Sequence, residues 1–158
     1  MGKKTTIVLF SGEMDKALAA FNIATGAASM GMEVTMFFTF WGLNVLRREK
    51  GGPKPQGLKR RLMALLNRGG ARRLPLSKLH LLGLGTRMMK SVMTENKMPS
   101  VEEMIRLAKE LGVKLVACTT TMGFMGLTRE SLIPEADTLA GVATYLGEAT
   151  EGQVNLFI

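Results

Sequence analysis

Cysteine and histidine are scarce in this 158-residue chain, which contains one of each, Cys118 and His80. A single cysteine cannot form a disulfide within the chain, and it excludes an intramolecular resolving thiol and any zinc site built from cysteines. A Cys–His dyad would require His80 to lie beside Cys118, which the sequence does not establish. Because no second candidate base exists, the sequence argues against papain-like hydrolysis.

Long apolar runs are also absent. No stretch approaches the roughly 18 apolar residues of a membrane-spanning helix, and the first apolar run, residues 7–10, is too short for the core of a signal peptide. We therefore expect a cytoplasmic protein, because a lone cysteine fits a reducing compartment. Hydrophobic residues make up 46% of the chain and charged residues 22%, as in ordinary globular proteins, so we expect one domain over residues 1–158.

Acidic residues are nearly missing from one segment. Residues 47–73 contain ten Lys or Arg and one acid, Glu49, so they carry a net charge of +9 in a chain whose total is +8. The basic charge therefore belongs to a single insert at about 47–75 and not to the fold as a whole. Such a segment attracts anions, acidic proteins, nucleic acids or lipid headgroups.

This basic insert also lacks aromatic residues. Without Phe, Tyr or Trp it offers no ring for base stacking, and it matches no nucleic-acid motif, so the sequence argues against nucleic acid as a partner. A solvated, mobile insert is the leading interpretation. The alternative is that it docks an acidic protein, or lies on a membrane surface through one face of an amphipathic helix expected over 58–67. The apolar residues of that helix are Leu58, Leu62, Met63, Leu65 and Leu66.

Short apolar runs alternate with helical patterns along the chain. The expected strands are 4–10, 34–40, 113–118 and 153–158. The expected helices are 14–30, 41–46, 100–111 and 137–148, with a loop and short helix over 79–93 and a loop or short helix over 122–127. Ser100 and Glu103 have capping-box spacing. The alternation predicts an α/β fold, a mostly parallel sheet with helices on both faces in a Rossmann-like three-layer arrangement.

Cys118 stands where one of these strands ends. The apolar run Val113–Cys118 is followed by Thr119, Thr120, Thr121, Met122 and Gly123. In open α/β folds, ligands bind at the carboxyl ends of the strands. Backbone N–H groups after Cys118 and the three threonine hydroxyls could stabilise a thiolate or a bound anion there. A small buried hydrophobe at a strand end is an equally good interpretation, since free cysteine is among the most buried residue types.

Two further groups follow the first two strands and are expected at the same edge. Ser11 and Gly12 form a turn that lacks the G-x-G-x-x-G and Walker patterns, so a simple strand-to-helix connection is the alternative to an anion site. Trp41 follows the second strand, where its ring could line a pocket beside the thiol or pack in the core.

Most of the chain resembles the DsrE/DsrF-like sulfur-relay family, in its DsrE-type branch that is sometimes labelled peroxiredoxin-like. The peroxiredoxin label has no support here, because Leu115 stands three residues before Cys118 where a Thr-x-x-Cys pattern would need threonine. The matching stretches are FSGEMDKALAAFNIATGAASMGMEVTMFFTFWGLN (10–44), LGTRMMKSVM (84–93), ELGVKLVACTTTMGFMGLTRESLI (110–133) and GVATYLGEATEGQVNLFI (141–158).

The resemblance implies a compact α/β fold with a parallel sheet of about five strands, assembled as a homo-oligomer, often a trimer or hexamer. It implies that Cys118 matches the family's cysteine after the fourth strand. In better-known relatives this cysteine carries sulfur as a persulfide, which it exchanges with TusA-type carriers or rhodaneses. Such chemistry needs no metal and no organic cofactor.

Two functional hypotheses follow. In the first, the chain is a sulfurtransferase or sulfur carrier that holds sulfur as a persulfide on Cys118 and passes it to an acceptor thiol. In the second, it is a non-catalytic module that binds an anion or a nucleotide-like ligand at the strand edge and docks a partner through the basic insert. In both, the expected binding residues are Ser11, Gly12, Trp41, Thr119, Thr120, Thr121 and Gly123.

Overall fold

Five short strands form one parallel sheet in the computed structural model, which describes residues 2–158. Their order across the sheet is β4-β3-β2-β1-β5, and every neighbouring pair runs parallel. The strands are β1 (Lys4–Leu9), β2 (Glu33–Phe38), β3 (Lys114–Cys118), β4 (Thr138–Ala140) and β5 (Val154–Phe157). The expected α/β, Rossmann-like fold with a parallel sheet of about five strands is confirmed.

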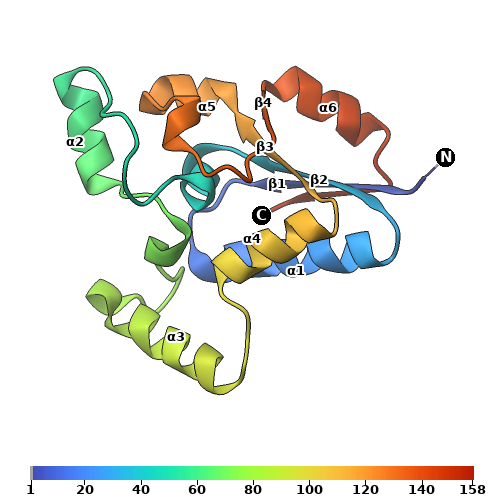
Figure 1. Cartoon of the computed structure of the whole chain (residues 1–158), viewed down its shortest axis with the longest axis horizontal. Coiled ribbons are helices and arrows are strands. Elements are labelled where there is room, and N and C mark those ends of the chain that lie inside the picture. The colour runs from blue at the N-terminus through green and yellow to red at the C-terminus, as the bar shows by residue number, and fades with distance from the viewer. Residues whose placement is uncertain (1) are drawn as a thin grey trace.

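Helices cover both faces of the sheet. Figure 1 shows α1 and α4 on one side and α5 and α6 on the other. The α-helices are α1 (Met14–Ser29), α2 (Leu58–Leu66), α3 (Leu84–Glu95), α4 (Val101–Glu110), α5 (Thr119–Met125) and α6 (Val142–Thr150). The 3₁₀ segments are η1 (Phe40–Leu46), η2 (Ala71–Arg73), η3 (Leu81–Gly83) and η4 (Arg129–Ser131). The predicted capping box is present, because the Glu103 N–H donates to Ser100 Oγ and the Ser100 N–H donates to Glu103 Oε2.

The two faces of the sheet differ in how deeply they are buried. The larger core lies against α1 and α4 and includes Phe21 and Phe38. The other face carries a small cluster of Val8, Phe37, Val116, Cys118 and Ala140, with Tyr145 of α6 packed against it. None of the residues of α6 is buried. Cys118 therefore belongs to the thinner side of the molecule.

The segment 137–148 is not one helix as expected, because its first part extends the sheet. Residues Thr138–Ala140 form β4, which pairs with β3, and the helix begins only at Val142. Asp137 directs this, since its carboxylate accepts the Leu115 N–H at 2.8 Å. Pairing with the free edge of β3 satisfies backbone groups that a helix would have left unpaired. Cys118 ends β3, the third strand along the chain, and not a fourth strand as the resemblance implied.

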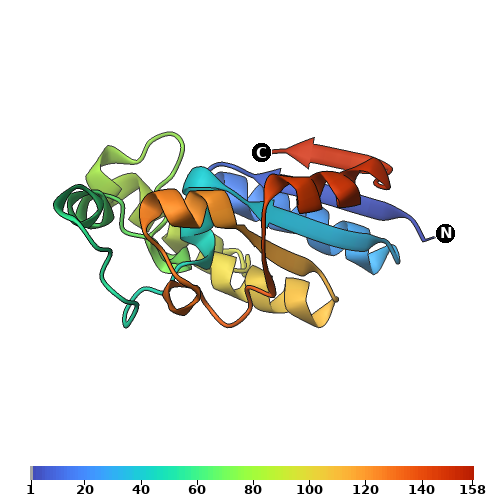
Figure 2. The same ribbon diagram turned by 90° about the horizontal axis from the view of Figure 1, so that it is seen from above.

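Two other expectations change in detail. Residues 122–125 belong to α5, which starts directly after Cys118 and leaves no loop between strand and helix, and Gly126 caps its end. Residues 41–46 form the 3₁₀ segment η1 instead of an α-helix. The basic insert projects from the sheet, and Figures 1 and 2 show α2 and α3 at the same end of the molecule. Within residues 2–158, none of the helices combines the length and apolar character needed to cross a membrane.

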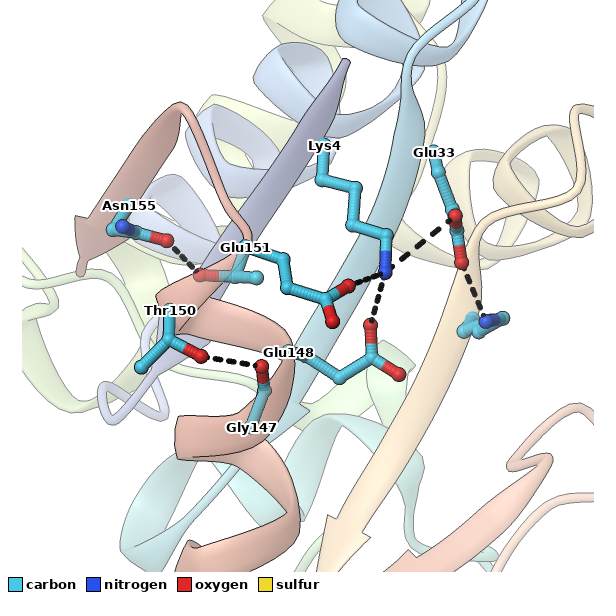
Figure 3. Close-up of polar contacts among 9 residues, drawn as sticks. Lys4, Glu33, Gly147, Glu148, Thr150, Glu151 and Asn155 are labelled. Carbon is cyan, nitrogen blue, oxygen red and sulfur yellow. Dashed lines mark hydrogen bonds and ion pairs between the residues drawn. The ribbon is translucent and has the colours of Figure 1, made fainter. Parts of the chain in front are cut away.

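An ion cluster joins elements at the opposite, amino-terminal edge of the sheet. The Lys4 ammonium lies between three carboxylates, forming a hydrogen bond with Glu151 and ion pairs with Glu148 at 3.6 Å and Glu33 at 3.9 Å (Figure 3). Glu33 also pairs with Lys114 at 2.7 Å. The hydrogen bond to Glu151 raises the pKa of Lys4. These contacts link β1, β2, β3 and the end of α6, and they fix the edge opposite Cys118.

Gly42 closes the connection from β2 back onto β1. Its N–H donates to the Phe10 carbonyl at 2.8 Å, and a Cβ built on it would lie 1.9 Å from the Leu9 carbonyl oxygen. We expect Gly42→Ala to lower the free energy of unfolding by on the order of 3 kcal/mol, because two backbone segments would have to separate. Urea unfolding followed by circular dichroism measures this.

Gly26→Ala is the matched control, because Gly26 is exposed within α1 and nothing lies within 4 Å of its added Cβ. Removing a glycine from an open helical position should raise the free energy of unfolding by about 0.5–1 kcal/mol. Equal stability of the two variants would contradict the assigned contact between η1 and β1.

Candidate functional site

Cys118 joins β3 to α5. It is the last residue of the strand and the N-cap of the helix, and it is 5% exposed. In the register of β2 with β3, Phe38 pairs with Ala117, so the next residues along the two parallel strands, Thr39 and Cys118, are neighbours. The thiol is thus held at the carboxyl edge of the sheet between the end of β2 and the first turn of α5.

Hydroxyl and amide groups surround the sulfur. Thr121 contributes its N–H and its hydroxyl, Thr39 its hydroxyl and Thr120 its N–H. The two threonine hydroxyl oxygens lie 3.1 Å apart, and the Phe40 N–H donates to Thr121 Oγ1 at 3.1 Å. That oxygen accepts from Phe40, and its own proton can be donated to Thr39 Oγ1 or to the sulfur. The network ties together β2, η1 and α5 around one sulfur atom.

Burial and these contacts shift the pKa of the thiol in opposite directions. Burial raises the pKa of Cys118, but the hydrogen bonds from Thr121, Thr39 and Thr120 together lower it further than burial raises it. The pKa of Cys118 therefore lies below the ordinary value of a cysteine. A thiolate is the nucleophilic form of cysteine, so this environment favours reactivity over the inert state of a fully apolar site.

An aromatic row runs along the same edge of the sheet. Ring centroids lie 5.8 Å apart for Phe157 and Phe10, 5.4 Å for Phe10 and Phe40, and 6.3 Å for Phe40 and Phe124. All four rings are partly exposed. Phe40 has φ of 47°, a conformation that is costly for a bulky residue, and its N–H is bound by Thr121. The same hydrogen bond therefore fixes both the aromatic row and the thiol.

Gly12 and Trp41 lie together, but around a different cavity. A Cβ on Gly12 would lie 2.7 Å from the Trp41 carbonyl oxygen, so only glycine permits this approach. Both residues line a cleft of about 490 Å³, to which Arg68 and His80 also contribute and Cys118 does not. The predicted site residues thus separate into a thiol group and a cleft group.

The remaining predicted residues have varied surroundings. Ser11 is buried, and its N–H donates to the Ile158 carbonyl at 3.2 Å. Thr119 and Thr120 are exposed in the first turn of α5. The Gly123 carbonyl accepts a hydrogen bond from Arg60 of α2 at 3.3 Å. Of the three threonines after Cys118, Thr121 alone turns its side chain inward.

His80 is engaged away from the thiol. Its Nδ1 lies 2.8 Å from Oγ1 of Thr86 in the first turn of α3. No group of three or more His, Cys, Asp or Glu side chains among residues 2–158 is placed to hold a metal ion.

The sequence did not single out Thr39 or three members of the aromatic row, Phe10, Phe124 and Phe157, whereas Phe40 stood at the expected strand edge beside Trp41. Thr39 directly follows the second predicted strand, so it stood at the expected edge. Predicting its role requires knowing that β2 is the neighbour of β3 and that Phe38 pairs with Ala117. Neither the strand order nor the register can be derived from a single sequence.

Solved structures support the fold. The chain matches the E. coli ychN protein with a TM-score of 0.58 at 10% identity, covering 100% of both chains. It matches the protein MTH1491 from Methanobacterium thermoautotrophicum with a TM-score of 0.55 at 12% identity, covering 99% of both chains. At these identities the likeness concerns the fold alone.

Sequence relatives define the family. The chain is 48% identical over 156 residues to the uncharacterized protein YrkE of Bacillus subtilis, covering 99% of this chain and 97% of YrkE. It is 30% identical over 166 residues to the sulfur carrier protein DsrE2 of Allochromatium vinosum, covering 99% of this chain and 98% of DsrE2. The model of the DsrE/DsrF/DrsH-like family matches residues 1–157, and the chain therefore belongs to that family, in which a relative is a sulfur carrier.

Proposed function

We propose that this protein carries sulfur as a persulfide on Cys118 and transfers it to an acceptor thiol. The observation that carries the proposal is the hydrogen-bonded thiol at the β3–α5 junction, whose pKa is lowered although it is buried. The sulfur carrier DsrE2 among the relatives agrees with it. The reaction would make the protein a sulfurtransferase or a carrier, depending on whether it accelerates transfer between partners or only stores sulfur.

The chemistry needs a single thiol. The Cys118 thiolate attacks the terminal sulfur of a donor persulfide, a new S–S bond forms, the S–S bond of the donor breaks, and the donor leaves as a thiolate. In the second step an acceptor thiolate attacks the terminal sulfur on Cys118, takes it as its own persulfide and releases the Cys118 thiolate. The two steps balance without an external oxidant or reductant, and no metal or organic cofactor takes part.

The surroundings of Cys118 fit both steps. The N–H groups of Thr120 and Thr121 and the hydroxyls of Thr39 and Thr121 would stabilise the thiolate when it attacks and when it leaves. The aromatic row beside it would give a protein donor or acceptor, such as a TusA-type carrier or a rhodanese, an apolar surface on which to seat its own thiol.

A second candidate function is ligand binding without chemistry, and the cleft favours it. Arg68 and Arg73 contribute positive charge there, and Trp41 contributes a ring next to the close approach at Gly12. An anion or a nucleotide-like ligand fits this combination of charge and aromatic surface. Because Cys118 does not line the cleft, the two functions are separable by experiment.

One prediction concerns the thiol pKa. Thr121→Val removes a hydroxyl donor while keeping shape, so the pKa of Cys118 should rise and the variant should hold less thiolate at neutral pH. We expect the alkylation rate by iodoacetamide near pH 7 to fall about tenfold, since a hydrogen bond to a charged group contributes about 1.5–3 kcal/mol. The rate measured against pH gives the midpoint, which should move upward.

Thr120→Val is the control, because its side chain is exposed and its N–H is retained. That variant should alkylate like the wild type. Identical pH midpoints for Thr121→Val and the wild type, with both folded, would contradict the assigned role of the Thr121 hydroxyl.

Another prediction tests the proposed function. After incubation with polysulfide, intact mass spectrometry of the wild type should show the addition of one or more sulfur atoms that a reductant removes. Cys118→Ser should show no such addition, since a hydroxyl cannot form the S–S bond. A folded wild type that stays unmodified, or a Cys118→Ser variant that accepts sulfur at the wild-type stoichiometry, would reject the proposal and direct attention to ligands of the cleft.

A further inference from the structure

Helix α2 turns its apolar side away from the protein. Four leucines recur at positions i, i+4, i+7 and i+8, which places them on one helical face, and each is 55–84% exposed. They are Leu58, Leu62, Leu65 and Leu66. The opposite side of α2 carries the partly buried Met63 and the guanidinium of Arg60, which donates to the Gly123 carbonyl of α5. The helix is therefore seated on the body by one side and exposes leucine on the other.

Cations border this leucine face. At 100° per residue, Lys59 lies on one side of the stripe and Arg61 lies on the other, and Arg68 follows just after the end of the helix. All three are exposed, and α2 contains no acidic residue. An apolar stripe with basic residues at both margins is typical of helices that lie in a membrane interface, where the stems of Lys and Arg reach back to the headgroups.

A second exposed apolar group lies at the same end of the molecule, in η3 and the start of α3 (Figures 1 and 2). Leu82 is fully exposed with φ of 54°, and Leu79 and Leu81, with φ of 58° and 43°, are also exposed. A positive φ is unfavourable for leucine, and an exposed leucine side chain contributes no burial energy to the core. Neither the backbone nor the packing of this chain is therefore stabilised by these leucines. Leu84 and Met88 continue the exposed surface along α3.

Both groups lie at one end of the molecule, which we call the leucine–basic end: α2, η3 and the first turns of α3. The cleft of about 490 Å³ adjoins both groups, because Leu65 and Leu66 of α2 line it together with His80, which precedes η3. A symmetric contact with a second copy would bring this surface against itself, and the +9 charge of residues 47–73 would then repel its equal. This positive charge favours an anionic partner.

We propose that the leucine–basic end binds the surface of an anionic lipid bilayer. The leucines enter the boundary between headgroups and acyl chains, and the flanking Lys and Arg side chains pair with lipid phosphates. A bilayer fits better than a groove on an acidic protein, because the apolar residues stand on two separate protruding elements and not on one helix alone. The inference goes beyond sulfur transfer and does not require it.

The test is co-sedimentation of the full-length chain with vesicles of phosphatidylglycerol and phosphatidylcholine, compared with vesicles of phosphatidylcholine alone. We expect binding to the anionic vesicles that weakens as salt rises. The double variant Lys59→Gln with Arg61→Gln should bind about 25-fold more weakly, because each cation near such a surface accounts for about fivefold. Leu62→Gln with Leu65→Gln should also reduce binding while leaving the charge unchanged.

The control is Val142→Gln with Leu146→Gln, which alters two exposed apolar residues of α6 away from the leucine–basic end and should bind like the wild type. Cys118→Ser should also bind like the wild type. Equal binding to both kinds of vesicle, or full binding by the two leucine–basic variants, would overturn the proposal. Absence of wild-type binding to anionic vesicles would overturn it as well and leave an acidic protein as the occupant.

Discussion

The parallel pairing of β2 with β3 is the constraint on which the proposed site depends. Its register sets Thr39 beside Cys118, and the immediate start of α5 brings Thr121 back over the sulfur. The Phe40 N–H then completes the network by donating to Thr121. A thiol in the small cluster against α6 would otherwise be an inert buried group, since burial alone raises its pKa. The hydrogen bonds outweigh that effect.

Much of the fold follows from short-range patterns, while the arrangement around the thiol does not. The apolar runs and the Ser100 capping box gave the strands and a helix start, because they depend on neighbours in sequence. Strand β4 escaped detection since its three residues become a strand only by pairing with β3, helped by Asp137. The position of Cys118 at a strand end was predictable. The position of Thr39 beside the thiol was not, because it depends on the order of the strands. The separation of Trp41 from the thiol depends on the path of η1.

The molecule keeps its two proposed activities apart. Sulfur chemistry is assigned to the edge where β3 meets α5, and lipid binding to an end where α2 and α3 project from the body (Figure 1). One contact joins them, because Arg60 of α2 donates to Gly123 in α5, the helix that begins after Cys118. A chain bound to a bilayer through α2 would thus hold α5, whose N-cap is Cys118, near the membrane.

The central claim is that the protein holds Cys118 as a thiolate more readily than an unperturbed cysteine. Ultraviolet titration of thiolate absorbance, with Cys118→Ser subtracted, measures this directly, because the chain contains one cysteine. The account predicts a single transition below the ordinary cysteine pKa, reflecting the donors of Thr39, Thr120 and Thr121. A transition at or above the ordinary value would mean that burial prevails, and it would contradict the assignment of Cys118 as a sulfur-carrying nucleophile.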